Sequence, residues 1–325
     1  MRAYILRRIL LIIPTLIVLS VIVFLSIRLV PGSVIDLMVS QHGGGGDMPG
    51  SSGQTINPEA IRHSLGLDLP IYKQYANWVS DMVLHGNMGS SLWTKTTVIE
   101  QITQRAPITF ELGLIAFVIS MIIAIPIGIY SAVRQDTMSD YVGRTIAIIG
   151  LAVPSFWIAT IIMVYPSVWW NWSPPVEYTS FTQNPLQNLQ IMIIPAIIIG
   201  LSSAGTIMRY TRTMMLEVLR QDYIRTAWSK GLKERVVVLR HALKNALIPI
   251  VTILAGQVTI LISGSVIMEQ IFNIPGMGRL FLDVLTKRDY SMVSGLNLFY
   301  GFIGLVLILL TDLSYAWLDP RVRYN

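Results

Sequence analysis

Ionisable side chains inside long apolar runs are the first candidates for chemistry in this sequence of 325 residues. Carriers that couple transport to protons or ions need such groups near the middle of the bilayer. Glu111 and Glu269 stand near one end of their apolar segments, and Asp312 stands near the end of the last segment. Glu111 could meet a substrate amine, but an interfacial ion pair with Arg105 is the simpler interpretation. No acidic residue is central, so the sequence does not favour ion-coupled transport.

Catalytic and cofactor-binding patterns are absent from the sequence. It has no cysteine, which excludes disulfides, thiolate metal sites and cysteine nucleophiles. Its four histidines are scattered, and neither H-E-x-x-H nor G-x-S-x-G occurs. No G-x-x-x-x-G-K-[ST] loop occurs, so this chain cannot cradle ATP in that way. We therefore expect no catalytic residue, no metal and no cofactor bound by this chain.

The composition predicts an all-α integral membrane protein. Hydrophobic residues make up 53% and charged residues 13% of the chain, whereas soluble domains average about 25% charged residues. Only helices satisfy their own backbone over such lengths in lipid. The first apolar segment has a basic start like a signal peptide, but its length and the lack of a cleavage site predict a retained span. The six expected spans are residues 9–30, 108–133, 145–166, 189–209, 247–269 and 295–317.

Lysine and arginine predict the orientation, because they resist translocation across the membrane. They flank the first span, the loops after the second and fourth spans, and the C-terminus. Residues 165–188 contain neither and include the aromatic run WWNW, which is typical of an outer interface. Both termini are therefore expected in the cytoplasm, and the net charge of +6 needs no nucleic-acid partner.

Two external segments follow from this topology. Residues 31–106 form a large first loop with flexible GGGG and SSG runs, but its second half has helical spacing. Residues 269–290 mix proline and glycine with bulky apolar residues, which favours a structured cap over a slack linker. The expected regions are 1–30 as the first helix, 31–106 as the external loop, 107–318 as a five-helix core with a cytoplasmic loop at 210–246, and 319–325 as a tail.

The densest basic run lies between the fourth and fifth spans. The stretch MLEVLRQDYIRTAWSKGL predicts an amphipathic helix with one apolar stripe from Leu216 through Tyr223 to Ala227. Gly231 follows where a left-handed residue would end that helix. A second stripe, beginning at Val236, continues into the fifth span. The sequence thus predicts two helices joined at one glycine.

A basic amphipathic helix has two possible environments. It can lie among lipid headgroups, where anionic lipid attracts its charges. It can also dock in a groove on another protein, and the compact apolar cluster beside the charges favours this second environment. That cluster consists of Tyr223, Ile224, Ala227, Trp228 and Leu232.

This stretch resembles the EAA loop of ABC-importer permeases, in the form found in the dipeptide, oligopeptide and nickel family. The family pattern is similar to D-Y-I-R-T-A-x-x-K-G-L followed by R-H-A-L-x-N-A-L-I-P, and residues 222–232 and 240–249 match it. The GGGG run departs from the family pattern. Further resemblances, in the family's order along the chain, are LGLDLPIYKQYANWV, MGSSL, AVPSFW, EQIFNIPGMGRL, RDY and LDPRVRY.

The resemblance implies the type I importer architecture of six helices, in a bacterial or archaeal inner membrane, and ATP-driven uptake of peptides or related small solutes. It implies a second homologous permease, two cytoplasmic ABC ATPases that bind ATP and Mg, an external solute-binding protein and membrane lipid as partners. It also implies that the loop at 222–249 couples transport to an ATPase, and a helix continuous with the fifth span would act as the lever. The residues assigned to this contact are Asp222, Arg225, Thr226, Ala227, Trp228, Lys230, Gly231 and Leu232.

Two alternatives stay open from the sequence. The chain could instead work alone as an ATP-independent secondary carrier or channel. Polar residues of the fourth and fifth spans could line a translocation path, or they could, with Gly205, Gly256 and Gly264, let helices pack closely. The path candidates are Ser202, Ser203, Thr206, Gln257, Thr259 and Ser263.

Overall fold

The protein is all-helical in the part that the structure describes. The structure is a computed structural model that describes residues 2–28, 68–91, 93–264 and 266–318. Within these ranges the chain forms helices and loops, with one isolated bridge between Ser90 and Thr97. The all-α prediction is confirmed there. The GGGG run, His42, His63 and the tail at 319–325 lie outside the described residues.

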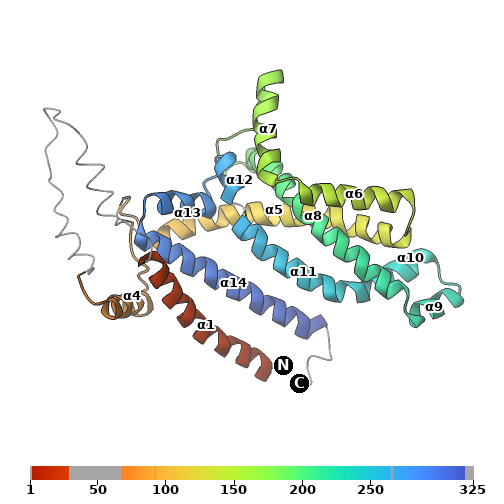
Figure 1. Ribbon diagram of the computed structural model, residues 1–325, viewed down its shortest axis with the longest axis horizontal. Coiled ribbons are helices and arrows are strands. Elements are labelled where there is room, and N and C mark those ends of the chain that lie inside the picture. Colours follow the sequence, from red (N-terminus) through yellow and green to blue (C-terminus); the bar gives the residue numbers. More distant parts are fainter. Residues whose placement is uncertain (1, 29–67, 92, 265, 319–325) are drawn as a thin grey trace. The chain divides into compact units, whose positions relative to one another are not determined.

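Contacts divide the chain into two compact units. Unit 1 contains Met1–Arg8, Ala106–Arg279 and Gly304–Asn325, and unit 2 contains Ile9–Arg105 and Leu280–Ile303. Figure 1 labels the helices of both units. The bounds are α1 Arg2–Arg28, α4 Ile71–His85, α5 Val98–Val133, α6 Met138–Ala152, α7 Ser155–Trp170, α8 Pro185–Leu219, α9 Asp222–Ser229, α10 Glu234–Val236, the π-helix η1 Val237–Ala242, α11 Leu243–Gly264, α12 Val266–Ile271, α13 Met277–Thr286 and α14 Tyr290–Leu318.

Four described helices, α1, α5, α8 and α14, are long and apolar enough to cross a membrane. The bent pair α6 and α7 makes a fifth span if it is counted as one. The expected fifth segment, 247–269, is divided between α11 and α12, and the side chains of 259–265 lie outside the described part. The described residues thus show four or five of the six predicted spans.

The third predicted span, 145–166, is not one straight helix. α6 ends at Ala152, α7 begins at Ser155, and the two helices meet at 85°. Pro154 causes this break, because it has no backbone N–H and its ring disfavours helical geometry at the residue before it. Val153 accordingly has extended φ and ψ angles of −84° and 123°. Figure 1 shows α7 directed away from α6.

Helix α8 forms the centre of unit 1. Two of its glycines bring neighbouring backbones close, since a Cβ at Gly205 would lie 2.6 Å from the Ala147 carbonyl oxygen of α6, and one at Gly200 would lie 2.9 Å from the Ala116 carbonyl oxygen of α5. Small residues permit this approach between helices in membranes. The buried side chains of α8, among them Met192 and Ile207, fill the space on either side.

In unit 2, the second half of the first loop is helical as predicted. Helix α4 lies against the end of α1, where the ring of Phe24 is 5.2 Å from the ring of Tyr75 and 5.8 Å from that of Trp78. The hydroxyl groups of Ser20 and Tyr75 are 2.8 Å apart and hydrogen-bonded. The aromatic side chains of α4 thus lie on the face that packs against α1, which explains why this part of the loop is helical.

Two motifs that are far apart in the sequence, MGSSL and RDY, meet in unit 2. The Ser91 hydroxyl donates to Asp289 Oδ2 at 2.6 Å, and both residues are buried. The indole N–H of Trp93 donates to the Lys287 carbonyl oxygen at 3.1 Å. The Ser91 oxygen also accepts the backbone N–H of Trp93 and of Thr94. The Ser91 side chain therefore stabilises the turn at Trp93 and Thr94 and joins it to Asp289, just before α14.

Replacing Ser91 with alanine is expected to destabilise this junction. The change leaves a buried Asp289 carboxylate oxygen without its hydroxyl donor, which costs about 1–3 kcal/mol. Thermal unfolding of the purified protein in detergent, followed by tryptophan fluorescence, measures the effect. Ser90→Ala is the matched control, because Ser90 is exposed. Equal melting temperatures for the two variants would contradict the assignment.

Candidate functional site

The predicted amphipathic helix is two helices. α8 ends at Leu219, a break at Arg220 and Gln221 follows, and α9 begins at Asp222. The predicted stripe is confirmed at Leu216 and Ala227, which pack against or within the core of unit 1, but it is wrong at Tyr223, because the break changes which face α9 turns inward. The buried residues of α9 are Ile224 and Ala227, whereas the Tyr223 side chain is 45% exposed.

The glycine at the end of α9 has the predicted conformation. Gly231 has a φ of 75°, in the left-handed region, and a Cβ there would meet no atom within 4 Å. Its N–H donates to the Trp228 carbonyl oxygen, and the Lys230 N–H donates to that of Thr226. Glycine is used here for its backbone freedom, since space for a side chain exists.

The second predicted helix contains a π-helix, η1, which changes its buried face. Val236 is 37% and Leu239 46% exposed, so the stripe predicted from Val236 is wrong at its start, whereas it is confirmed further along, where Ala246 is fully buried. Val237, Val238 and Ala242 are buried instead. A π-helix bonds i to i+5 and holds more residues per turn, so the α-helical spacing does not apply. The expected uniform lever into the fifth span is therefore interrupted at 237–242, where π-helices often mark functional sites.

Five of the eight residues assigned to the ATPase contact lie on α9 itself, and the other three follow it directly. Ala227 is buried against the rest of unit 1, so it anchors α9 and does not face outward. Ile224, which is fully buried, is a second anchor that the assigned set omitted although its apolar side chain signalled it. The exposed members of the assigned set are Asp222, Arg225, Thr226, Trp228, Lys230, Gly231 and Leu232.

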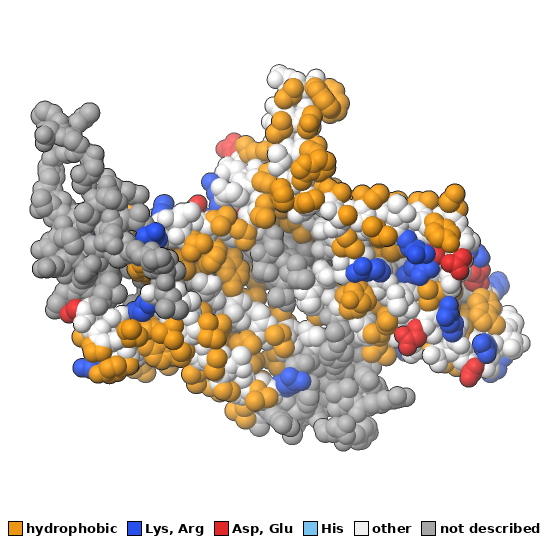
Figure 2. Space-filling model, in the orientation of Figure 1, with side chains coloured by type: hydrophobic (Ala, Val, Ile, Leu, Met, Phe, Trp, Pro, Cys, Tyr) orange, Lys and Arg blue, Asp and Glu red, His pale blue; other side chains and the backbone are white. Residues whose placement is uncertain are grey.

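Polar contacts stiffen α9 on its exposed side. The Thr226 hydroxyl donates to the Asp222 carbonyl oxygen at 3.0 Å, and Arg225 Nη1 lies 3.6 Å from Asp222 Oδ1. Asn245 Nδ2 of α11 donates to the Tyr223 hydroxyl at 3.0 Å. Figure 2 shows lysine and arginine side chains gathered over the region of α9 and α10. The result is a short helix with an apolar anchored face and a mixed aromatic and basic outer face.

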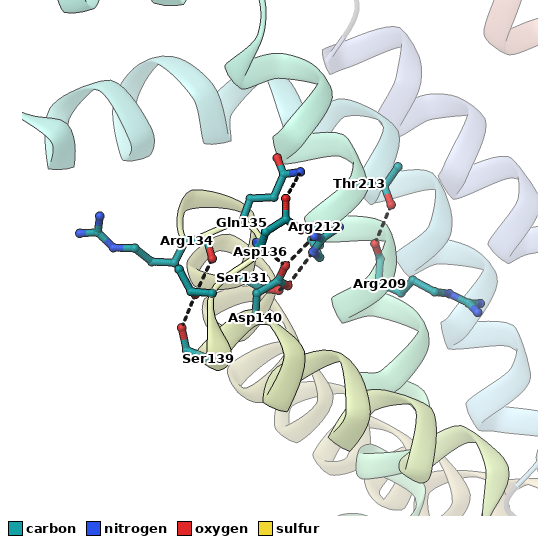
Figure 3. A network of polar contacts seen from close by, with 10 residues as sticks. Ser131, Arg134, Gln135, Asp136, Ser139, Asp140, Arg209, Arg212 and Thr213 are labelled. Carbon is teal, nitrogen blue, oxygen red and sulfur yellow. Dashed lines mark hydrogen bonds and ion pairs between the residues drawn. The ribbon is translucent and has the colours of Figure 1, made fainter.

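A buried ion pair, which the sequence reasoning missed, joins α6 to α8. Asp140 in the first turn of α6 is fully buried and accepts from Arg212 Nε at 2.8 Å and Nη2 at 2.7 Å. Figure 3 shows Ser131 of α5 directed at the same carboxylate, to which its hydroxyl donates. A fixed fork of this kind sets geometry as well as charge. The available signal was an acidic residue in the short segment between the second and third predicted spans.

A second buried carboxylate organises the predicted cap in unit 1. Glu269 of α12 is fully buried, and it accepts from the Thr109 hydroxyl at 2.7 Å and from the Arg279 backbone N–H at 2.9 Å. The Thr109 oxygen in turn accepts the Met277 N–H at 2.8 Å. A Cβ at Gly276 would lie 2.4 Å from the Glu269 carboxyl carbon. The prediction of a structured segment is confirmed, and Glu269 is its polar centre.

The six path candidates lie on two helices. Ser203 is buried in α8, while Ser202 and Thr206 are half-buried on the same helix. Ser202 lines an apolar cavity of about 260 Å³ between α5, α6 and α8. Gln257 is half-buried on α11, and a Cβ at Gly256 would meet no atom within 4 Å. Thr259 and Ser263 also lie on α11, but their side chains are outside the described part.

The long apolar helices are those of a membrane protein with several spans. Two buried carboxylates join its helices, and α9 presents an exposed basic face. The region from residue 124 to residue 324 matches the family described as binding-protein-dependent transport system inner membrane component. Residues 1–113 match the N-terminal region described for such transport system membrane components. The chain therefore belongs to the binding-protein-dependent transport system inner membrane component family.

Relatives share the full length of the chain. A candidate peptide transport system permease protein of Brucella abortus is 38% identical over 325 residues, with all of both chains covered. The dipeptide transport system permease protein DppB of Escherichia coli is 34% identical over 353 residues, and the oligopeptide transport system permease protein AppB of Bacillus subtilis is 37% identical over 327 residues. Both alignments also cover the whole of each chain.

A solved structure supports the fold. The crystal structure of an amino acid ABC transporter with histidines aligns with a TM-score of 0.51 at 11% identity. The alignment covers 67% of this chain and 94% of that chain. The protein is thus a permease component of an ABC transporter in the bacterial inner membrane, not an ATPase, and members of its family work with ATPase and binding-protein partners.

Proposed function

We propose that this permease imports peptides or related small solutes by alternating access, and that α9 couples it to separate ATPase subunits. The observation that supports this most directly is the two-faced structure of α9. Ile224 and Ala227 anchor the eight-residue helix to unit 1, and its other face exposes Tyr223, Arg225 and Trp228. An anchored helix with exposed aromatic and charged side chains suits a groove on a partner protein.

The proposed assembly has four partners besides lipid. A second homologous permease completes the pathway, two ATPase subunits bind ATP and Mg, and an external solute-binding protein delivers the solute. In this assembly both termini and α9 face the cytoplasm, as the distribution of lysine and arginine predicts. This orientation, together with six spans, is part of the proposal. It puts the basic loop at 210–246 on the same side as the ATPases.

Peptides are proposed as substrates because the full-length relatives are named peptide, dipeptide and oligopeptide permease proteins. The path through the membrane is proposed to run along α8 and α11. Its candidates are Ser202, Ser203, Thr206, Gln257, Thr259 and Ser263. The close approach of α8 to α6 at Gly205 favours packing as the role of that glycine.

Reconstitution tests the proposal against a carrier or channel that works alone. The two permeases are placed in liposomes, and uptake of a labelled dipeptide is measured with and without the ATPases, ATP and the binding protein. We expect no uptake until all components are present. Uptake by the permeases alone would replace this proposal with an ATP-independent carrier or channel.

The exposed face of α9 has its own test in the same system. Trp228→Glu is expected to weaken ATPase retention in a pull-down by about 10-fold or more, since exposed aromatic anchors of interfaces often contribute 2 kcal/mol or more. Phe181→Glu is the control, because Phe181 is similarly exposed on the loop between α7 and α8. Equal retention by both variants would remove α9 from the contact.

A further inference from the structure

Three elements of unit 1 converge on the Asp140 carboxylate: α8 through the two Arg212 hydrogen bonds, α5 through the Ser131 hydroxyl, and the turn between α5 and α6 through the Asp136 backbone N–H at 3.1 Å. Figure 3 shows these groups around one carboxylate. Because Arg212 binds through two parallel hydrogen bonds, α8 cannot rotate or slide freely against α6 at this point.

Close backbone packing beside the Asp140–Arg212 pair also holds α5 against α8. A Cβ at Gly128 of α5 would lie 2.8 Å from Thr211 Cβ and 2.9 Å from the Met208 carbonyl oxygen, both in α8. Gly128 is about one helical turn before Ser131, and Thr211 is next to Arg212. Packed interiors transmit strain because they do not deform continuously. Helices α5, α6 and α8 are therefore held together at a single level of the bundle.

The C-terminal end of α5 packs less closely against η1 than against α8. A groove of about 450 Å³ separates α5 from η1, lined by Ile129, Tyr130 and Val133 on one wall and by Val238 and Leu239 on the other. The ion pair that crosses it, Arg134 Nη2 to Glu234 Oε2, is 3.5 Å long, and both side chains are about half exposed. Exposed ion pairs of this kind contribute little to stability. The inner end of α5 is thus fixed to α8 far more firmly than to η1.

We propose that the Asp140–Arg212 pair is the joint that passes a displacement of α9 to α5 and α6. This inference rests on the proposed coupling role of α9. Arg212 lies about two turns before the end of α8, and α9 begins just beyond that end. Along the chain, a pull on α9 therefore reaches Arg212 before it reaches the rest of α8, while the Asn245–Tyr223 hydrogen bond joins α9 directly to α11. Asp140 and Arg212 act as positioning residues, and the interrupted helix through η1 is the more compliant route.

Stability alone does not account for the pair. A buried ion pair often gives no net gain over apolar residues of the same volume, because two charges must lose their water. Its defined geometry is the distinguishing property. The pair should therefore affect how many solute molecules move per ATP, whereas a purely structural pair would affect only the amount of assembled transporter.

The first test measures that ratio in the complete reconstituted transporter. Asp140→Asn keeps the shape but removes the charge, and Arg212→Lys keeps the charge but removes the fork. We expect the number of dipeptides imported per ATP to fall by roughly 2- to 30-fold in both, as for residues along a coupling route. ATPase retention in the pull-down stays unchanged. Glu177→Gln is the control, because it removes an exposed carboxylate from the loop between α7 and α8, outside the contacts of Asp140 and Arg212.

The second test measures the joint itself and does not depend on uptake. The natural chain has no cysteine, so Thr137→Cys and Ser229→Cys, both at exposed positions, allow two spin labels to be placed in the turn and on α9. In the wild-type background their distance distribution is expected to stay narrow when ATP is added. In the Asp140→Asn background it is expected to broaden.

Each outcome decides the question. Normal import per ATP with an unchanged label distance in both variants would overturn the joint and leave the α9 contact standing. Failure of both variants to assemble would also overturn it, because the pair would then serve folding alone. Loss of ATPase retention in Trp228→Glu, with normal coupling in Asp140→Asn, separates the α9 contact from the joint.

Discussion

Gly231→Val should reduce solute uptake by the reconstituted transporter to about a tenth of the wild-type rate or less. Gly231 has a φ of 75°, which a β-branched residue adopts only at a cost of about 1–3 kcal/mol. No side chain or backbone atom blocks a Cβ there, so the effect is one of backbone strain. The strain is relieved by displacing the end of α9, and the coupling contact then loses its geometry.

Two variants isolate the cause. Gly231→Asn should retain most of the uptake, because asparagine tolerates the left-handed conformation. Gly86→Val places the same residue at the end of α4, where Gly86 has a φ of 64° and no atom within 4 Å of a Cβ. It should leave ATPase retention in a pull-down unchanged. If Gly231→Val supported wild-type uptake, the conformation of this residue would have no role in coupling.

Gly276→Ala should strongly destabilise the cap formed by α12 and the residues that follow it. The added Cβ would lie 2.4–2.5 Å from the three carboxyl atoms of Glu269, so the buried carboxylate has to move. The hydrogen bonds from the Thr109 hydroxyl and the Arg279 N–H are then lost or lengthened. Each donor left unsatisfied in a buried site costs about 1–3 kcal/mol.

The measurement is thermal unfolding of the purified permease, together with uptake stimulated by the binding protein. Gly256→Ala is the matched control within a helix, because no atom lies within 4 Å of a Cβ at that position. It should be neutral or slightly stabilising, since alanine favours a helix over glycine by about 1 kcal/mol. A melting temperature for Gly276→Ala equal to that of Gly256→Ala would show that the Glu269 carboxylate accommodates the methyl group without loss.

The sequence predicts the long helices well, because apolar runs in lipid have few alternatives to a helix. It also predicts the ends that depend on one residue type, as at Gly231, where only the backbone freedom of glycine is needed. Helical spacing likewise predicts the helix in the second half of the first loop. The mixture of proline and glycine with bulky apolar residues predicts the structured segment that includes α12. These features depend on local chemistry.

The errors arise where geometry departs from the regular helix. Spacing rules assume 3.6 residues per turn without interruption, so they gave the wrong face for Tyr223 after the Arg220 break and for Val236 and Leu239 around η1. Pro154 stands within the third predicted span, but the angle between α6 and α7 depends on how α7 packs against α8 and α12, which a proline alone does not reveal.

The buried polar contacts of Asp140 and Glu269 could not be predicted from the sequence for another reason. Asp140 and Arg212 are far apart in the sequence, and each has an ordinary local interpretation, one as an acidic residue in the first turn of a helix and the other as one of many basic residues. Their partnership exists only after α6 packs against α8. Glu269 was noted as an acidic residue near a span end, but the Thr109 hydroxyl that binds it comes from a distant helix.

The π-helix η1 has a consequence for comparing this chain with other sequences. One turn of such a helix holds about one residue more than an α-helical turn, and each residue of an α-helix corresponds to a rotation of about 100°. A chain that lacked one residue between 237 and 242 could close this turn into a regular one. Its α11 would then be rotated by that angle relative to α10, and a different set of side chains would face the bundle. Alignments that place a gap elsewhere in the loop would therefore assign the wrong inward-facing residues to the fifth span.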